Sequence, residues 1–276
     1  MSAAVLALWV AAGVLVAAAS LPVTLAIGIV LAWARRALHF TRRALPAPPR
    51  HLPFVSSLAR ELWAQLVIVG WTIARRGRAL APPVGGGPTV VLVHGLMADG
   101  PSMWGLRRAL HAAGRPTVAP SMGGALRPIA SYAERLERVL SSQDGPVDVV
   151  CHSLGGIVLR TCLEKHPRLR ERVRRVVTIA SPHHGSGAAR WLPIPEARAL
   201  VPGGAFITAL PSLRALLPTA RITTIASRHD CVVYPHDTSR VEGARTHELD
   251  DLMHAELVVD DGAVRLAVDA ITDEAA

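Results

Sequence analysis

Ser153 lies where a run of apolar residues meets a pair of glycines, and this setting suits a serine that performs covalent chemistry. Residues 147–151 (VDVVC) are apolar except for Asp148, as expected of a strand that is covered on both faces. Gly155 and Gly156 follow the serine and would let the next helix pack closely against that strand. The pattern predicts a nucleophile elbow, a sharp strand-to-helix turn that presents the serine hydroxyl to a base and to nearby amide N–H groups.

One position departs from the usual pattern of this turn. The motif G-x-S-x-G has a glycine two residues before the serine, and this chain has Cys151 there. The position must be small because the turn crowds the strand end against the helix, and cysteine is small enough. The alternative interpretation is that Ser153 caps an ordinary strand-to-helix turn, since short motifs also occur by chance.

A serine nucleophile needs donors for the oxyanion, and these are expected after an earlier strand. Residues 88–93 (PTVVLV) predict that strand, and His94 and Gly95 follow it at once. Here the chain resembles the bacterial lipase and esterase branch of the α/β-hydrolase superfamily, in which a His-Gly dipeptide opens the oxyanion loop. The resemblance implies that the backbone N–H groups of Leu96 and Leu154 bind the oxyanion, and that His94 shapes the loop rather than acting as a base.

The acid of the expected triad should come after the serine and before the histidine. Residues 221–227 (RITTIAS) predict a late strand, and Asp230 follows it. A carboxylate just past a strand end and before an apolar pair resembles the acid loop of these lipases, so Asp230 is the predicted acid. Asp237 lies further along the loop and is the alternative.

The base should lie after the last strand, which residues 244–249 predict. His254 follows that strand after a short loop, where the catalytic histidine of the family falls. His247 lies inside the predicted strand and is the weaker candidate. Asp250 and Asp251 are interpreted as loop residues at the edge of the sheet.

A further motif supports the resemblance. Residues 175–180 (RVVTIA) predict another strand, and it ends in residues 181–185 (SPHHG). A turn of this composition resembles a signature of lipase-type hydrolases, and we expect it to line the cleft, with no catalytic role for His183 or His184. Four motifs in the right order, each at a strand end, are far more specific than the elbow alone.

The elements that must position these residues alternate between strand and helix. Helices are predicted over residues 102–113, 129–142 and 156–166. This alternation indicates an α/β fold with a mostly parallel central sheet flanked by helices, and residues 82–276 are enough for one such domain. The resemblance identifies it as an α/β-hydrolase fold.

The chemistry expected is hydrolysis of a carboxylic ester through an acyl-enzyme, with Ser153 as nucleophile, His254 as base and Asp230 as its orienting acid. No cofactor or metal ion is expected. Residues 186–218 are rich in Pro, Leu, Ala and Gly and could form a cap that favours a lipophilic ester; the alternative is a segment that merely covers the sheet. A phospholipase or acyl-thioesterase would use the same triad. A non-catalytic membrane scaffold with a hydrolase fold is the alternative of another class.

The N-terminal segment predicts attachment to a membrane. Residues 3–34 contain no charged residue and are long enough to cross a bilayer, so residues 1–34 are interpreted as a transmembrane anchor rather than a cleaved signal peptide. Four arginines follow between residues 35 and 43, which places the catalytic domain on the cytoplasmic side of a bacterial inner membrane.

Residues 35–81 form a basic juxtamembrane segment that contains a second apolar run at 62–73. The run is short for a span and has charged residues on both sides. We therefore interpret it as an interfacial helix with Trp63 and Trp71 at headgroup depth, a second short span being the alternative. Residues 82–87 are the expected linker into the catalytic domain.

Net charge and cysteine usage bound the remaining possibilities. The formal net charge is +9, but only one residue, Lys165, is a lysine, and the arginines are scattered without aromatic interleaving, so nucleic-acid binding is not expected. Three cysteines offer no paired framework and suit a reducing compartment. The sequence leaves the oligomeric state open.

Overall fold

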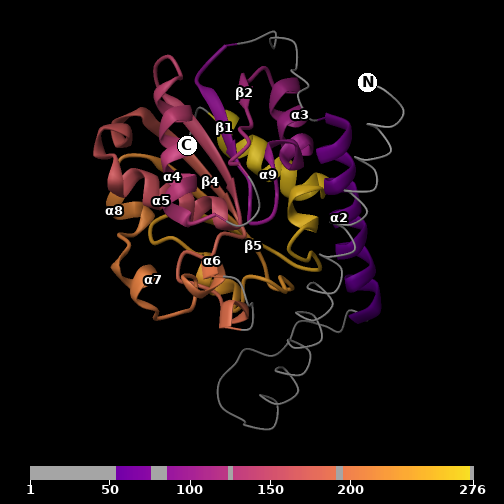
Figure 1. Ribbon diagram of the computed structural model, residues 1–276. Coiled ribbons are helices and arrows are strands. Elements are labelled where there is room, and N and C mark those ends of the chain that lie inside the picture. Colours follow the sequence, from indigo (N-terminus) through magenta and orange to yellow (C-terminus); the bar gives the residue numbers. More distant parts are fainter. Residues whose placement is uncertain (1–53, 76–85, 124–126, 191–194, 274–276) are drawn as a thin grey trace, which may run out of the picture.

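A parallel sheet organises the molecule. The computed structural model describes residues 54–75, 86–123, 127–190 and 195–273. In this part of the chain six strands, all parallel to their neighbours, form one sheet in the order β2-β1-β3-β4-β5-β6 (Figure 1). The strands are β1 (Thr89–Val93), β2 (Thr117–Val118), β3 (Val147–His152), β4 (Val173–Ile179), β5 (Arg221–Ser227) and β6 (Arg245–Leu249).

Helices cover both faces of this sheet. The longer ones are α2 (Phe54–Arg75), α3 (Trp104–Ala112), α4 (Ile129–Ser141), α5 (Leu154–Lys165) and α9 (Asp261–Thr272). The shorter ones are α6 (Pro195–Arg198), α7 (Ala205–Ala209) and α8 (Leu213–Leu216), with 3-10 turns η1 (Gly100–Met103), η2 (Pro167–Arg172), η3 (Gly187–Arg190), η4 (His236–Ser239) and η5 (Glu256–Val258). Helices α4 and α5 pack on one face, and α3 and α9 pack on the other.

Side chains along β1 point alternately to the two faces of the sheet, and each face forms a core with one layer of helices. Val91 and Val93 belong to the core under α4 and α5, whereas Val90 and Leu92 belong to the core under α3 and α9. Successive residues of a strand point to opposite faces, so a strand buried on both sides must be apolar throughout. The predicted fold class, a mostly parallel α/β sheet between helices, is confirmed.

Asp148, the carboxylate within the apolar run of the elbow strand, is paired inside the protein. Its carboxylate lies 2.5 Å from Nη2 of the buried Arg115 and 3.8 Å from Nη1 of Arg175. Arg115 also donates to the carbonyl oxygens of Pro88 and Ile271. A buried charge is tolerated when it is paired and hydrogen-bonded, which explains the break in the apolar pattern.

The boundaries of several elements differ from those predicted. β5 has the predicted bounds, while β4 begins at Val173, two residues before the predicted start. The helix predicted from residue 102 is divided into η1 and α3, and α5 begins at Leu154, directly after the candidate nucleophile.

Helix α2 is longer than the apolar run predicted at 62–73, and it packs on the domain that we expected to begin at residue 82. Ala64 is fully buried, and the ring of Trp71 approaches Gly105 of α3 so closely that a Cβ there would lie 2.8 Å from it. Trp63 and Leu66 remain 66% and 55% exposed. None of the helices within the described residues is long and apolar enough to traverse a bilayer, so a second span at 62–73 is not supported. The predicted anchor at 1–34 and most of the linker lie outside the described residues.

Two glycines allow α5 to start directly against the sheet, as the sequence predicts. A Cβ at Gly155 would lie 2.4 Å from the carbonyl oxygen of Val93 and 3.1 Å from that of His94. A Cβ at Gly156 would lie 2.5 Å from Oγ of Ser181. The elbow is therefore packed against β1 and the end of β4 with no room for a side chain.

We expect Gly155→Ala to lower the free energy of unfolding by about 1–3 kcal/mol, because the added methyl group must displace the backbone of β1. Gly70→Ala is the matched control: Gly70 lies in α2 with open space around it, so alanine there should leave stability unchanged or raise it by up to about 1 kcal/mol. Urea denaturation of the three proteins checks this. A Gly155→Ala variant as stable as the parent would contradict the packing described for the elbow.

Candidate active site

The backbone turns sharply at Ser153, between β3 and α5. Its φ is 53° and its ψ is −125°, a conformation that residues other than glycine rarely adopt. The N–H of Ser153 donates to the carbonyl oxygen of Ile179 at the end of β4 (2.9 Å), and its own carbonyl accepts from the N–H of Gly156 (3.2 Å). Such a conformation costs about 1–3 kcal/mol and persists only where the surrounding structure imposes it.

The structure brings Ser153, His254 and Asp230 together in one hydrogen-bonded series. Nε2 of His254 lies 2.9 Å from Oγ of Ser153, and Nδ1 of the same ring lies 2.8 Å from Oδ2 of Asp230. The other carboxylate oxygen of Asp230 accepts from the N–H groups of Val232 (2.7 Å) and Val233 (2.8 Å). All three residues are buried, so the series is shielded from water.

The environment of His254 favours its protonated form. Burial of the ring lowers its pKa, but the charge and hydrogen bond of Asp230, together with the charge of Glu61, raise it, and the net result is a pKa above the usual 6.5. The hydrogen bond to Asp230 assigns the proton of the neutral ring to Nδ1. The lone pair of Nε2 then faces the hydroxyl of Ser153.

The loop after β1 passes directly beside Ser153. A Cβ at Gly95 would lie 3.0 Å from Cβ of Ser153, so Leu96, the next residue, lies in the loop at the nucleophile. Leu154 is the first residue of α5, and the N–H groups in the first turn of a helix have no acceptor within that helix. Leu96 and Leu154 therefore both lie next to Ser153, and the oxyanion role that the resemblance implies for their N–H groups stays a prediction.

His94 holds the shape of that loop. Its Nδ1 lies 2.9 Å from the carbonyl oxygen of Gly95, and its Nε2 accepts from the N–H of Met122 (3.3 Å). The ring is buried, and burial lowers its pKa. These contacts fit a neutral, structural histidine.

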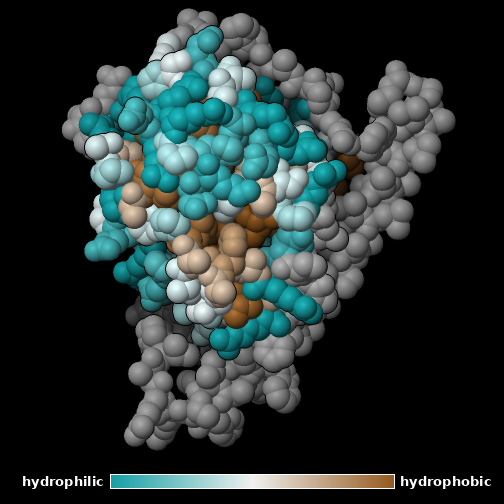
Figure 2. All heavy atoms as spheres, turned by 60° about the vertical axis from the view of Figure 1, so that its left-hand side comes forward, coloured by the Kyte–Doolittle hydropathy of each residue, from teal (hydrophilic) through white to brown (hydrophobic). Residues whose placement is uncertain are grey.

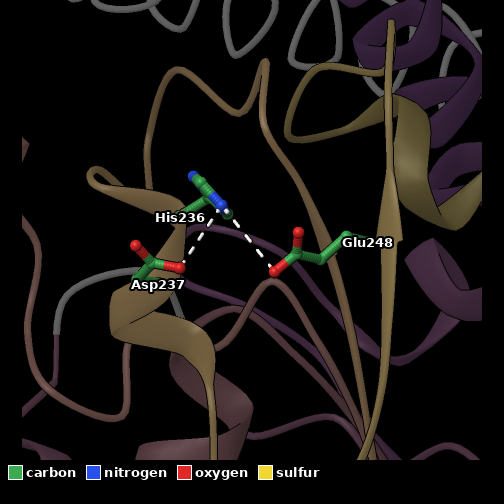
Figure 3. A group of neighbouring side chains, drawn as sticks. All are labelled: His236, Asp237 and Glu248. Carbon is green, nitrogen blue, oxygen red and sulfur yellow. Dashed lines mark ion pairs between the residues drawn. The ribbon is translucent and has the colours of Figure 1, made fainter. Parts of the chain in front are cut away.

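The alternative candidates lie in other surroundings. Asp237 is in η4, where its carboxylate lies 3.0 Å from Nε of Arg240 and 3.4 Å from Nε2 of His236 (Figure 3). His247 is half-buried within β6, and burial lowers its pKa. Within the described residues, neither is recorded in contact with Ser153 or His254.

His236, Asp237 and Glu248 could supply metal ligands, since one atom from each lies within 4.8 Å of the others (Figure 3). Arg240 pairs with both carboxylates of the group, and Arg228 also lies 3.3 Å from Glu248. The guanidinium groups of Arg240 and Arg228 thus neutralise the carboxylates of Asp237 and Glu248, whose negative charge a metal ion would need.

The turn at residues 181–185 carries a buried histidine, and the expectation that the turn lines the cleft stays a prediction. His183 is buried, its Nε2 lies 3.3 Å from Oγ1 of Thr178, and burial with the nearby Arg160 charge lowers its pKa to about 3. The buried Arg160 of α5 donates to the carbonyl oxygens of His183 (2.6 Å), Leu210 (2.7 Å) and Pro211 (3.0 Å). Arg160 therefore ties α5 both to this turn and to the segment before α8.

That segment is part of the predicted cap. Leu200, Ile207, Leu210 and Leu213 share one buried cluster with Leu154. Figure 2, turned so that the side carrying α7 and α8 in Figure 1 comes forward, shows an apolar area in the lower half of this face beneath a mostly hydrophilic one. The segment thus covers the core next to the elbow and leaves apolar surface beside it.

Two hollows differ in their relation to Ser153. A small one, with space of about 10 Å³, is lined by residues of the oxyanion loop and the start of α5, together with Met122 and Tyr132. A hollow of about 510 Å³ lies at the starts of β4 and β5, where Arg175 and Arg221 line it. Because the strands are parallel, this larger hollow is at the opposite end of the sheet from Ser153.

Sequence reasoning missed three residues next to the candidate triad. The ring of His152 packs against that of His254 at a tilt of 38°, with centroids 4.8 Å apart, and burial and the nearby His254 charge hold the pKa of His152 well below its usual value. Arg60 and Glu61 of α2 contact the loop that carries His254. Because His152 directly precedes Ser153, the sequence could have indicated that it lies near the triad. Nothing in the sequence around Arg60 and Glu61 indicated that these residues lie near it.

Comparison with known proteins agrees with the observed fold. Residues 90–271 match the model of a family described as the alpha/beta hydrolase family. Among solved structures, Aspergillus fumigatus lipase B is 16% identical, with a TM-score of 0.62, over 79% of this chain and 74% of that one. The mature form of Bacillus licheniformis lipase BlEst2 is 18% identical, with a TM-score of 0.55, over 70% and 94% of the two chains. The metagenomic carboxyl esterase MGS0156 is 18% identical, with a TM-score of 0.55, over 71% and 77%.

At these identities the likeness to solved structures shows the shared fold. A comparison with curated protein sequences gave no match. The family match begins at residue 90, after the end of α2.

Proposed function

This chain belongs to the alpha/beta hydrolase family, and we propose that it is a serine hydrolase that cleaves carboxylic esters. The observation that carries the proposal is the series of hydrogen bonds from Oγ of Ser153 through both ring nitrogens of His254 to Asp230. A nucleophile, a base and an orienting carboxylate in this geometry are what acyl transfer to a serine requires.

In the first half of the reaction His254 takes the proton of Ser153 at Nε2 while Oγ attacks the ester carbonyl. Asp230 keeps the ring in the tautomer that can accept this proton and stabilises the imidazolium that forms. The N–H groups of Leu96 and Leu154 bind the oxyanion of the tetrahedral intermediate. Each such donor typically lowers the barrier by about 3–4 kcal/mol.

In the second half the imidazolium of His254 returns the proton to the leaving alcohol. Water then enters, loses a proton to Nε2 and attacks the acyl group on Ser153. The second tetrahedral intermediate collapses when the bond from the acyl carbon to Oγ breaks, His254 returns its proton to Oγ of Ser153, and the carboxylic acid leaves.

A lipophilic ester is the favoured substrate class. The segment between α6 and α8 carries partly buried apolar side chains such as Val201 and Phe206, and apolar surface of this kind suits a lipophilic group. Two of the similar structures are named lipases and one a carboxyl esterase, which agrees with an ester substrate. Phospholipids and acyl-thioesters are alternatives within the same chemistry.

A non-catalytic scaffold is the alternative of another class. The alignment of Ser153, His254 and Asp230 argues against it, since a scaffold needs neither the strained turn nor a buried histidine between two polar partners.

Hydrolysis of p-nitrophenyl esters from acetate to palmitate by the full-length protein tests the proposal. We expect Ser153→Ala to lower kcat by at least about 10³-fold and Asp230→Asn by roughly 10²–10⁴-fold, because each removes a member of the series. Asp237→Asn is the matched control, a change of the same kind in the same loop, and its activity should equal that of the parent. The chain-length optimum would separate an esterase from a lipase.

Two outcomes of that assay would count against the proposal. Equal rates for the parent and Ser153→Ala over the whole series would remove Ser153 as the nucleophile. A loss in Asp237→Asn with full activity in Asp230→Asn would reassign the acid.

We also propose that the chain is attached to a bacterial inner membrane through residues 3–34, with the catalytic domain in the cytoplasm. The uncharged run and the arginines after it support this, as do the exposed Trp63 and Leu66 on α2. The protein should stay in the membrane pellet after alkaline carbonate extraction, and protease added to spheroplasts should leave the domain intact. Release by carbonate would contradict the anchor, and digestion from outside would contradict the orientation.

A further inference from the structure

Helix α2 contacts the loop that carries His254 from outside the region matched to the family. Nε of Arg60 lies 2.8 Å from Oε1 of Glu256, and its Nη2 donates to the carbonyl oxygen of Asp251 (2.5 Å). The second oxygen of Glu256 accepts from the N–H of Met253 (2.7 Å). The loop is therefore held to α2 on both sides of His254.

Glu61, the next residue of α2, lies beneath this loop. Its side chain is fully buried, and its Oε2 accepts from the N–H of Ala255, the residue directly after His254, at 2.8 Å. Its Oε1 accepts from Nε2 of Gln65 at 3.3 Å. Since both oxygens accept hydrogen bonds from N–H groups, the contacts suit an ionised carboxylate.

The charges around Glu61 link it to the candidate triad. Burial raises the pKa of Glu61, the charge of Asp230 adds to that rise, and the charge of His254 and the hydrogen bonds from Ala255 and Gln65 oppose it, with a net increase. In turn, burial lowers the pKa of His254 while Asp230 and Glu61 raise it, with a net increase. The remaining titratable group facing Glu61 is the buried thiol of Cys231, whose pKa burial raises first and the charges of Glu61 and Asp230 raise further.

A carboxylate in this place is costly unless it serves the groups around it. Burial of an unpaired charge is strongly unfavourable, and an apolar residue of similar size would pack α2 against the domain without that cost. Glu61 does two things that an apolar residue cannot: it fixes the backbone next to His254, and it adds negative charge beside a ring that must become an imidazolium.

We propose that Glu61 is a positioning residue for His254, and that α2, although it precedes the region matched to the family, is a working part of the active site. The inference rests on the proposed serine-hydrolase function. Glu61 acts through His254 and has no contact of its own with the reacting hydroxyl. Its effect should therefore fall on the chemical step and on the protonation of His254 rather than on substrate binding.

Two substitutions in the full-length protein separate these effects. Glu61→Gln keeps an oxygen for the N–H of Ala255 but removes the charge, so the acid limb of the pH profile of kcat/KM should move to lower pH. The sign follows because loss of a nearby negative charge disfavours the imidazolium and lowers the pKa of His254. Glu61→Ala removes both charge and hydrogen bond and should lower kcat by about tenfold to a hundredfold with KM nearly unchanged.

Glu164→Gln is the matched control, because Glu164 is exposed near the end of α5 that lies away from Ser153. Its pH profile and kcat should equal those of the parent. An acid limb unchanged in Glu61→Gln would overturn the proposal and leave Glu61 a purely structural residue.

An NMR titration of the Cε1–H of His254, assigned by comparison with His254→Ala, reads the same effect without turnover. A lower pKa in Glu61→Gln than in the parent supports the proposal, and an equal pKa overturns it. If the parent hydrolysed no ester, the proposed function would fail, yet this titration would still decide the role of Glu61. Glu61→Gln is nearly isosteric, so the test remains decisive even if Glu61→Ala does not fold.

Discussion

The conformation of Ser153 is the constraint on which the rest of the site depends. A positive φ at a non-glycine residue is unfavourable, and it is held here because the turn follows β3, a fully buried strand, and α5 begins directly after it. The hydrogen bond from Ser153 to Ile179 ties the turn to the neighbouring strand. Gly155 permits the close approach to β1 that keeps the loop of Gly95 beside the serine. The packing around the turn thus imposes the strained backbone of Ser153, and that backbone sets the direction of its hydroxyl.

The parallel sheet explains how residues a hundred positions apart meet at that hydroxyl. The carboxyl ends of parallel strands lie along one edge, so the loops after β3, β5 and β6 open on the same side. These loops carry Ser153, Asp230 and His254. The amide groups of Val232 and Val233 then fix the carboxylate, and the carboxylate fixes the ring. The backbone thus orients Asp230, Asp230 orients His254, and His254 faces the hydroxyl of Ser153.

Features that depend on local order along the chain could be predicted from the sequence. A strand followed by a polar residue places Asp230 at the correct edge, and β5 has its predicted bounds because its residues alternate between two buried faces. Features that depend on contacts between distant segments could not. His183 is buried, and nothing in the motif around it indicated that Arg160 of α5 donates to its carbonyl oxygen.

The contacts of helix α2 with the domain also could not be predicted from the sequence. Charged residues before an apolar run suit either a membrane interface or a packed helix, and the sequence cannot distinguish the two. The partners of Arg60 and Glu61 in the loop that carries His254 lie more than 190 residues further along the chain. Only the folded structure shows that Glu61 is buried beneath the loop of His254 rather than flanking a membrane helix.

The central claim is that the hydroxyl of Ser153 is an activated nucleophile, and covalent labelling measures this without assuming a substrate. The full-length protein should react with a fluorophosphonate probe, and peptide mass spectrometry should locate the adduct on Ser153, whereas His254→Ala should label far more slowly because it lacks the base. Absence of an adduct in folded parent protein, or an adduct on another residue, would contradict the claim.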